Sequence, residues 1–139
     1  FGLPLTISYT YTNATFENDF ISGFEGWGQV NSGDQLPYIA NNQLAVGLGI
    51  DHPKFAINLN GRYMDAMRTS PGQDEIPTNE GTDDYFVIDV SANYKLDQHF
   101  NLFANALNIT NEIYSVARRP AGLRPGMPRA FNLGIKANF

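Results

Sequence analysis

The last nine residues of the chain alternate strictly between apolar and polar or small side chains, and this pattern most constrains the fold. The polar or small positions are Asn132, Gly134, Lys136 and Asn138, and the apolar positions between and around them are Phe131, Leu133, Ile135, Ala137 and Phe139. Successive side chains of a β-strand point to opposite faces. The segment therefore predicts a strand over 131–139 with one apolar and one polar face, ending on an aromatic residue.

The same alternation recurs in five earlier segments, which are 3–11, 44–50, 55–63, 86–95 and 100–107. In the last of these, Phe103 and Leu107 interrupt the polar face, and Phe100, Leu102 and Ala104 define the apolar one. Long connections over 13–35, 65–83 and 108–128 alternate with short turns at 51–53 and 96–99. The sequence predicts an all-β, antiparallel, up-and-down arrangement of six strands in three pairs.

Composition excludes several function classes. The chain has 139 residues, a net charge of −5 and no cysteine, which argues against a nucleic-acid partner, disulfides and a cysteine zinc site. No stretch approaches the length of an apolar transmembrane helix. The loop acids lack the spacing of a calcium loop, so we expect no metal and no cofactor; these acids are Asp65, Asp74, Glu75, Asp83 and Asp84.

Two architectures place amphipathic strands in a sheet. A soluble β-domain buries the apolar face, whereas an outer-membrane barrel turns it to lipid. Strands of about nine residues, long loops on one side only, and aromatic residues at the ends of the apolar faces favour a transmembrane β-barrel. These aromatic residues are Tyr9, Tyr11, Tyr63, Tyr94, Phe100 and Phe139.

Six strands are too few to close a barrel in lipid, since the smallest such barrels have about eight strands. Open sheet edges in hydrocarbon leave backbone groups unpaired, at several kcal/mol each. We therefore expect residues 1–139 to be the C-terminal part of a larger barrel domain, with further polypeptide upstream of Phe1.

Four segments carry a family resemblance. Asn101–Tyr114, with Asn108-Ile-Thr-Asn111-Glu-Ile-Tyr114 at its end, resembles the penultimate-strand signature of TonB-dependent outer-membrane receptors. Gly126-Met-Pro-Arg129 resembles the segment that opens the last strand in that family, and Phe139 resembles its closing aromatic. Residues 36–43 are similar to the element before a descending strand. Residues 121–129 look most like receptors for ferric citrate or siderophores.

The resemblance implies a barrel of about 22 strands filled by an N-terminal plug and energised by TonB. Its location would be the bacterial outer membrane, and its function the active uptake of a scarce nutrient, a ferric chelate. The implied partners are the upstream strands and plug, TonB, outer-membrane lipid and lipopolysaccharide, and the barrel assembly machinery. A passive porin is the alternative. A barrel lipase or protease needs a Ser–His pair, but His52 and His99 lie in short turns, so no catalytic residue is predicted.

Candidate site residues fall into three groups. Arg118, Arg119 and Arg124 are candidates for binding an anionic ligand, because guanidinium groups match carboxylates and phosphates; contact with lipopolysaccharide phosphate or with the acidic loops is the alternative. Arg129 is assigned a structural role. The proposed assembly signal comprises Phe131, Leu133, Ile135, Ala137 and Phe139. The residues expected to face the lumen and to bond the plug or line a path are Asn58, Asn60, Arg62, Asp89, Ser91, Asn93 and Lys95.

Two further pairs of residues each have two possible roles. Gly47 and Gly49 point to the polar side, where they leave room for plug backbone or permit curvature. Phe24 and Trp27, in the first long connection, are expected either to contact ligand or to anchor that loop at the membrane surface.

Overall fold

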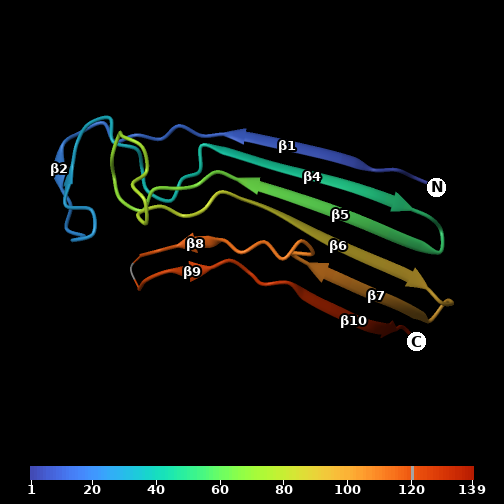
Figure 1. The fold of residues 1–139 in the computed structure, drawn as a ribbon. Helices are drawn as coiled ribbons and strands as arrows, with labels where there is room; N and C mark the ends of the chain where they lie inside the picture. Colours follow the sequence, from blue (N-terminus) through green and yellow to red (C-terminus); the bar gives the residue numbers. More distant parts are fainter. Residues whose placement is uncertain (120) are drawn as a thin grey trace.

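A computed structural model describes residues 1–119 and 121–139 as one six-stranded antiparallel sheet with two small hairpins outside it (Figure 1). This confirms the predicted up-and-down arrangement of six strands. The strands of the sheet, in spatial order, are β1 (Leu5–Tyr11), β4 (Asn42–Asp51), β5 (Phe55–Met64), β6 (Tyr85–Lys95), β7 (Phe100–Leu107) and β10 (Ala130–Ala137). The described residues contain no helix long and apolar enough to span a membrane.

The two ends of the sheet differ in their connections (Figure 1). At one end, here called the turn end, β4 joins β5 through a tight turn in which His52 N and Phe55 O, and Phe55 N and His52 O, are bonded. The turn between β6 and β7 is capped by Asp97, whose Oδ1 accepts bonds from His99 N and Phe100 N. The opposite end, the loop end, carries the three long connections.

The strand register gathers the apolar side chains on one face of the sheet. One row of directly paired residues crosses all six strands and is apolar throughout: Leu5, Leu48, Leu59, Val90, Ala106 and Phe131. A polar row on the opposite face comprises Gly49, Asn58, Ser91, Asn105 and Asn132. The expected faces of 100–107 are confirmed, with Phe103 and Leu107 on the polar side.

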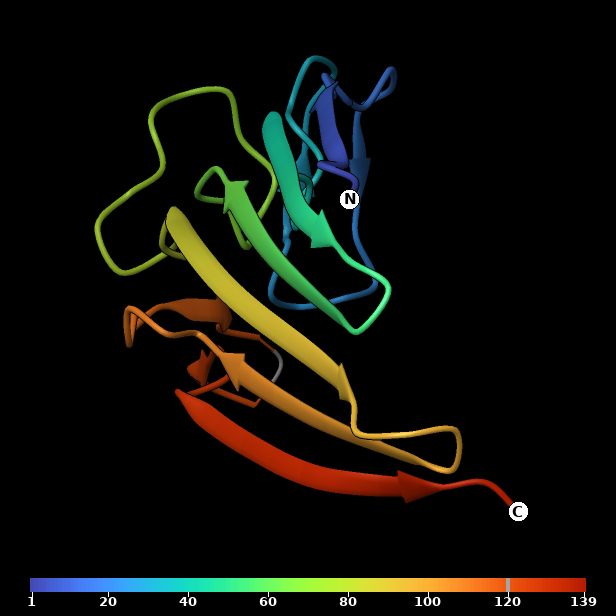
Figure 2. The same cartoon turned by 90° about the vertical axis from the view of Figure 1, so that its right-hand side faces the viewer.

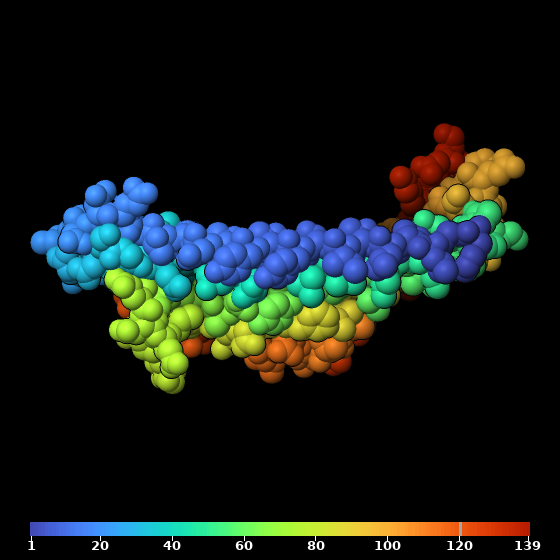
Figure 3. Space-filling view, turned by 90° about the horizontal axis from the view of Figure 1, so that it is seen from above, coloured from blue at the N-terminus to red at the C-terminus, as the bar shows by residue number. Residues whose placement is uncertain are grey.

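The apolar face has no protein packed on it. Leu133 is 82% exposed, Phe131 72% and Ile7 64%, and the buried apolar residues of the described chain are only Val30, Ala40, Val87 and Tyr114. The sheet is a single curved layer (Figure 2), and the edge strand β1 runs along a thin molecule (Figure 3). A soluble β-domain would bury this face in a core, so the arrangement has the form of a barrel wall.

The structure corrects several strand boundaries. β4 runs over Asn42–Asp51 rather than 44–50. The last strand ends at Ala137 rather than at Phe139, although Asn138 N still donates to His99 O at 2.9 Å. Phe139 is fully exposed, and its ring lies 5.9 Å from that of Phe100. The first strand begins at Leu5 rather than at residue 3, because Pro4 has no N–H to donate; a bridge between Gly2 and Asp51 resumes the pairing.

Two of the connections predicted as loops contain short hairpins. In the first, β2 (Phe20–Ile21) pairs with β3 (Gln29–Val30), and in the third, β8 (Ser115–Ala117) pairs with β9 (Arg124–Pro125). Strands of two or three residues give no detectable alternation in sequence. The hairpins are held by contacts between the connections.

Aromatic rings cover glycines on both faces of the sheet. On the polar face, a Cβ added to Gly134 would lie 2.3 Å from Cζ of Phe103, the residue paired with it. On the apolar face, a Cβ added to Gly61 would lie 2.9 Å from Cζ of Phe86. Each glycine therefore lets a large ring lie flat on the backbone.

We predict that Gly134→Ala destabilises the full-length protein, because the new methyl group collides with the Phe103 ring. The expected cost is about 1 kcal/mol, the lower end of the usual range for overpacking, because the exposed Phe103 ring can turn aside. Gly47→Ala is the matched control, since its Cβ would meet its nearest atom at 3.4 Å, an ordinary contact. Thermal unfolding followed by gel mobility measures both; equal midpoints would contradict the steric explanation.

Candidate functional site

The three long connections are bonded to one another at the loop end, and Asn108 is the central residue of one junction. Its backbone N donates to Asp89 Oδ1 at 2.8 Å. Its side-chain Nδ2 donates to Glu112 O and Met127 O, and its Oδ1 accepts from Glu112 N. Asn108 is 2% exposed and has a φ of 48°, a left-handed conformation that asparagine tolerates. It ties β6, the turn after β7 and the segment before β10 together.

Tyr114 completes this junction. Its side chain is 7% exposed, and its ring lies against Gly126, where a Cβ would come within 2.1 Å of Cζ. Gly126 N donates to Tyr114 O at 2.7 Å, and the Tyr85 ring packs 4.1 Å from the Tyr114 ring. The two motifs noted in the sequence, 108–114 and 126–129, are therefore one structural joint.

A second junction joins the second and third connections. Asp83 Oδ2 accepts hydrogen bonds from Ser115 Oγ at 2.7 Å and from Ser115 N at 2.8 Å. The pKa of Asp83 is lowered from its usual 3.8, first by the hydrogen bond from the Ser115 side chain and then by the bond from the Ser115 backbone. Burial opposes these effects, and nearby Arg118 adds to them. Arg118 Nε also donates to Gly81 O.

A third junction brings in the first connection through Tyr38. Its hydroxyl accepts from Arg119 N at 2.9 Å. The Arg119 side chain lies beside the first connection, where Nη1 is 2.9 Å from the position of a Cβ on Gly26. An aromatic cluster surrounds that point, in which the Trp27 ring lies 5.8 Å from Phe16 and 6.2 Å from Phe24.

Arg68 joins the first and second connections from a buried position. It is 6% exposed, and its Nε donates to Gln35 Oε1 at 3.1 Å. Its Nη2 donates to Asp74 O, and its backbone O accepts from Tyr38 N at 2.9 Å. Nothing in the sequence pattern distinguished Arg68 from other loop residues, and Tyr38 was noted only as part of the 36–43 resemblance.

The three candidate arginines belong to this cluster but differ in their surroundings. Arg118 and Arg119 are half-buried, and Arg118 holds a backbone carbonyl. Arg124 is exposed on β9, opposite Ala117. Phe24 and Trp27 lie near Arg119, so the structure brings basic and aromatic candidates together. Arg129 is placed before β10, with its guanidinium carbon 6.0 Å from the Phe131 ring centre.

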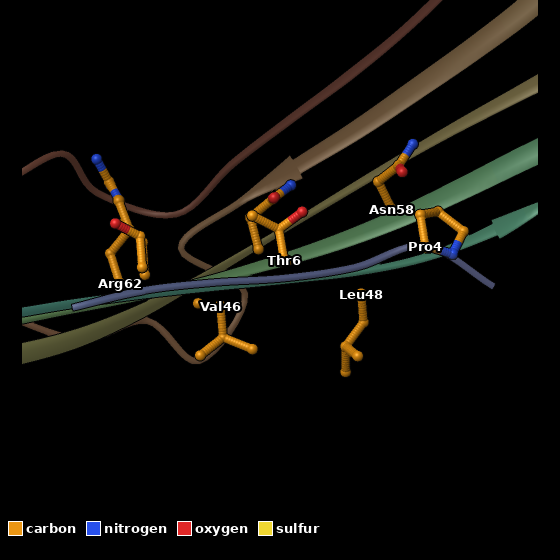
Figure 4. A pocket seen from close by; sticks show the side chains of 12 residues that line it. Pro4, Thr6, Val46, Leu48, Asn58 and Arg62 are labelled. Atoms are coloured by element: carbon orange, nitrogen blue, oxygen red, sulfur yellow. The ribbon is translucent and has the colours of Figure 1, made fainter.

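The seven residues expected to face a lumen all lie on the polar face by strand register. Beside some of them runs a trough of about 380 Å³ along β4, floored by Gly47 and Gly49. Figure 4 shows Arg62 and Asn58 projecting on this side and Val46 on the other. Arg62 and Asp89 form an ion pair at 3.8 Å.

No group of three His, Cys, Asp or Glu residues in the described part of the chain is placed to hold a metal ion. Asp65 and Asp83 are instead hydrogen-bonded to neighbouring residues. His52 and His99 both lie at the turn end, stacked on Phe55 and Phe139 respectively.

Comparisons place this geometry among known proteins. The sequence matches the family described as TonB dependent receptor-like, beta-barrel, over residues 1–109. A search of curated proteins found no match. The structure resembles the ferric-catecholate import receptor Fiu of E. coli K12 in its closed form, with a TM-score of 0.75 and 21% identity over 99% of this chain. It also resembles the siderophore receptor PiuA of Acinetobacter baumannii, with a TM-score of 0.73 and 15% identity over 97% of this chain.

The matched chains are much longer than this one. The present chain covers 19% of each of these two receptors. At these identities the likeness establishes the fold. The family match ends at residue 109, so the third connection and β10 lie outside it.

We predict that Asn108→Ala loosens the junction between the third connection and the barrel wall. The change leaves Glu112 N, Glu112 O and Met127 O without their partner, and each lost hydrogen bond contributes about 0.5–1.5 kcal/mol. Limited proteolysis of the full-length protein within 108–128 reports the effect. Thr110→Ala, an exposed change in the same turn, serves as the control. Equal cleavage rates of the two variants would refute the role of Asn108.

The Asp83–Ser115 junction is expected to weaken in acid. Because the pKa of Asp83 is lowered in the folded protein, its contribution is complete above the ordinary value of 3.8 and is lost as the pH falls through the lowered value. Hydrogen exchange at Ser115 should therefore be protected at pH 7 and lose protection, beyond the intrinsic pH effect, towards pH 3. Asp83→Asn should remove this extra pH dependence; an unchanged profile would argue against it.

Proposed function

Because the chain belongs to the TonB-dependent receptor-like β-barrel family, we propose that it forms the C-terminal wall and outer loops of an outer-membrane receptor that takes up a ferric chelate. The observation that carries this proposal is the apolar row across all six strands, left uncovered by protein. Lipid is the solvent in which such a face is stable, provided that the sheet closes. The loop end would then face the outside of the cell and the turn end the periplasm.

The proposed ligand-binding surface is the part of the loop end around Arg119, Arg124 and the aromatic cluster. Ferric complexes of citrate and of catecholates are anionic, and guanidinium groups suit such ligands. Aromatic side chains can in addition stack against the rings of a catecholate. The two structural neighbours, named as ferric-catecholate and siderophore receptors, support an iron chelate as the ligand class. Arg118 contributes by fixing the loop through Gly81 O rather than by a free guanidinium.

The remaining partners follow from the same proposal. Upstream strands would pair with the free edges of β1 and β10, and a plug would occupy the polar side, with TonB acting through it. The assembly machinery would read the apolar residues of β10 and Phe139. Outer-membrane lipid and lipopolysaccharide would contact the apolar face. The role is transport, with no chemistry performed on the ligand.

Loss of the two arginines assigned to the ligand-binding surface should impair uptake. In the full-length receptor, Arg119→Ala with Arg124→Ala is expected to reduce affinity for the ferric chelate by roughly tenfold or more, given about 1.5–3 kcal/mol for each hydrogen bond to a charged group. Arg119→Ala and Arg124→Ala are also measured singly against Arg129→Ala, the control, which removes one charge of the same sign from the neighbouring segment. Uptake of radioactive iron at limiting concentration is the measurement; a larger defect in the control would move the site away from Arg119 and Arg124.

Deleting the gene for the full-length receptor tests the proposed uptake of a ferric chelate. The expected result is loss of growth on one ferric chelate under iron limitation, restored by the wild-type gene only when TonB is present. Restoration without TonB would favour a passive porin. Normal growth on ferric citrate and on ferric catecholates would contradict an iron chelate as the ligand.

A further inference from the structure

All three lysines of the chain lie on a single rung of the sheet at the turn end. Lys95 N donates to Lys54 O at 2.8 Å, Lys95 pairs with Asn101, and Asn101 pairs with Lys136. The rung therefore reads Lys54, Lys95, Asn101, Lys136 across four adjacent strands, and we call it the lysine row. Lys95 lies two residues from Asn93, and Lys54 lies four residues from Asn58, so the row is on the polar face with these asparagines.

The lysine row lines a pocket. The pocket has a volume of about 320 Å³, and its walls also include His52, Ala56, Asn93 and Phe103. The Phe103 ring lies flat over Gly134 and forms an apolar part of the floor. The amides of Asn93 and Asn101 supply donors and acceptors between the ammonium groups. The surface is thus cationic, with hydrogen-bonding groups and an apolar floor.

The charges of the row are unbalanced in the described residues. The ion pair found in the described part of the chain joins Arg62 to Asp89, outside the row. No ammonium group of the row has a described carboxylate oxygen within 4.0 Å. Of the carboxylates nearest in sequence, Asp97 caps the β6–β7 turn. Asp51 lies on the same face, paired with Ala56 on the next rung, but forms no ion pair with a lysine of the row in the described residues. Lys54 and Lys95 stand directly opposite each other, and like charges in that relation destabilise a sheet. An anionic partner would convert this repulsion into attraction.

The shape of the row selects the kind of anion. Neighbouring strands are about 4.8 Å apart, so the row extends over roughly 14 Å from Lys54 to Lys136. One small anion does not span that distance, whereas several carboxylates along a polypeptide do. The flanking asparagines match backbone amides, and Phe103 offers contact to an apolar side chain.

We propose that the lysine row is a docking surface for an acidic segment of the polypeptide that fills the barrel, near its periplasmic end. The proposal rests on the proposed function, which places the polar face inside a barrel. The receptors of similar structure are long enough to supply such a segment, because this chain covers 19% of their length. The charge of the chain also fits: six arginines and twelve of the fourteen acidic residues lie outside the turn end, leaving it with three lysines and two aspartates.

Photo-crosslinking in the full-length receptor tests the proposal. A photoreactive phenylalanine replaces Asn101, within the lysine row, and irradiated receptor is digested and analysed by mass spectrometry. The expected product joins this position to a peptide of the same receptor that contains Asp or Glu. The variant K54Q/K95Q/K136Q should lose this product, because it removes the three charges and keeps the chain lengths similar.

The control carries the same total charge change on the same face but on other rungs. Thr6→Asp, Asn105→Asp and Asn132→Asp together add three negative charges, as the glutamine variant removes three positive ones, and should retain the cross-link. Outer-membrane level, heat-dependent gel mobility and iron uptake are measured for all variants, so that failure of the barrel or of uptake is recognised separately. A cross-link that survives in the glutamine variant overturns the proposal. So does a cross-link found only with a different protein, and so does the absence of any cross-link within the receptor.

Discussion

The backbone register of the six antiparallel strands is the constraint on which the other features depend. Because side chains alternate between faces, a slip of one residue in any pair would exchange the apolar and polar sets of that strand. The apolar row from Leu5 to Phe131 and the lysine row at the turn end both require every pairing to be in step. In hydrocarbon this pairing is also obligatory for energetic reasons, since an unbonded backbone group there costs several kcal/mol. The bridge between Gly2 and Asp51 continues the pairing past Pro4, where one donor is missing.

The loop end shows how the apolar face meets a polar region. Tyr9 donates to Asn42 Oδ1 at 2.6 Å, and Tyr63 donates to Asp65 Oδ1 at 2.7 Å. Asn42 connects the two by donating to Asp65 Oδ2 at 2.6 Å. Burial raises the pKa of Asp65, but the bonds from Tyr63 and Asn42 outweigh it, so that its pKa is lowered overall. Two tyrosines thus keep their rings on the apolar face while their hydroxyls join a polar network, as expected of aromatic residues at a membrane boundary.

The sequence predicted the strands and their faces because these depend on local alternation. Even Phe103 and Leu107, apolar residues on a polar face, were assigned correctly from the register of their neighbours. Asn108 and Tyr114 were noted through the family resemblance, but not the bonds that they make. The contacts of Tyr38 with Arg119, 81 residues away, and of Asp83 with Ser115, 32 residues away, left no local pattern. They arise only when three irregular connections fold against one another, so the candidate site was predicted as residue types and not as an arrangement.

The separation of arginine from lysine follows from what each side chain does. Arg68 and Arg118 donate to backbone carbonyls in fixed positions, a task for which a planar guanidinium with several directed donors is suited. Part of the positive charge at the loop end is therefore committed to holding the connections together, so the proposed ligand contacts are assigned to Arg119 and Arg124. The lysines of the turn end carry point charges on flexible stems, and none of them forms an ion pair in the described residues. Under the proposed function, the structured arginines of the loop end would face the outside, and the lysines of the turn end would face the segment that fills the barrel.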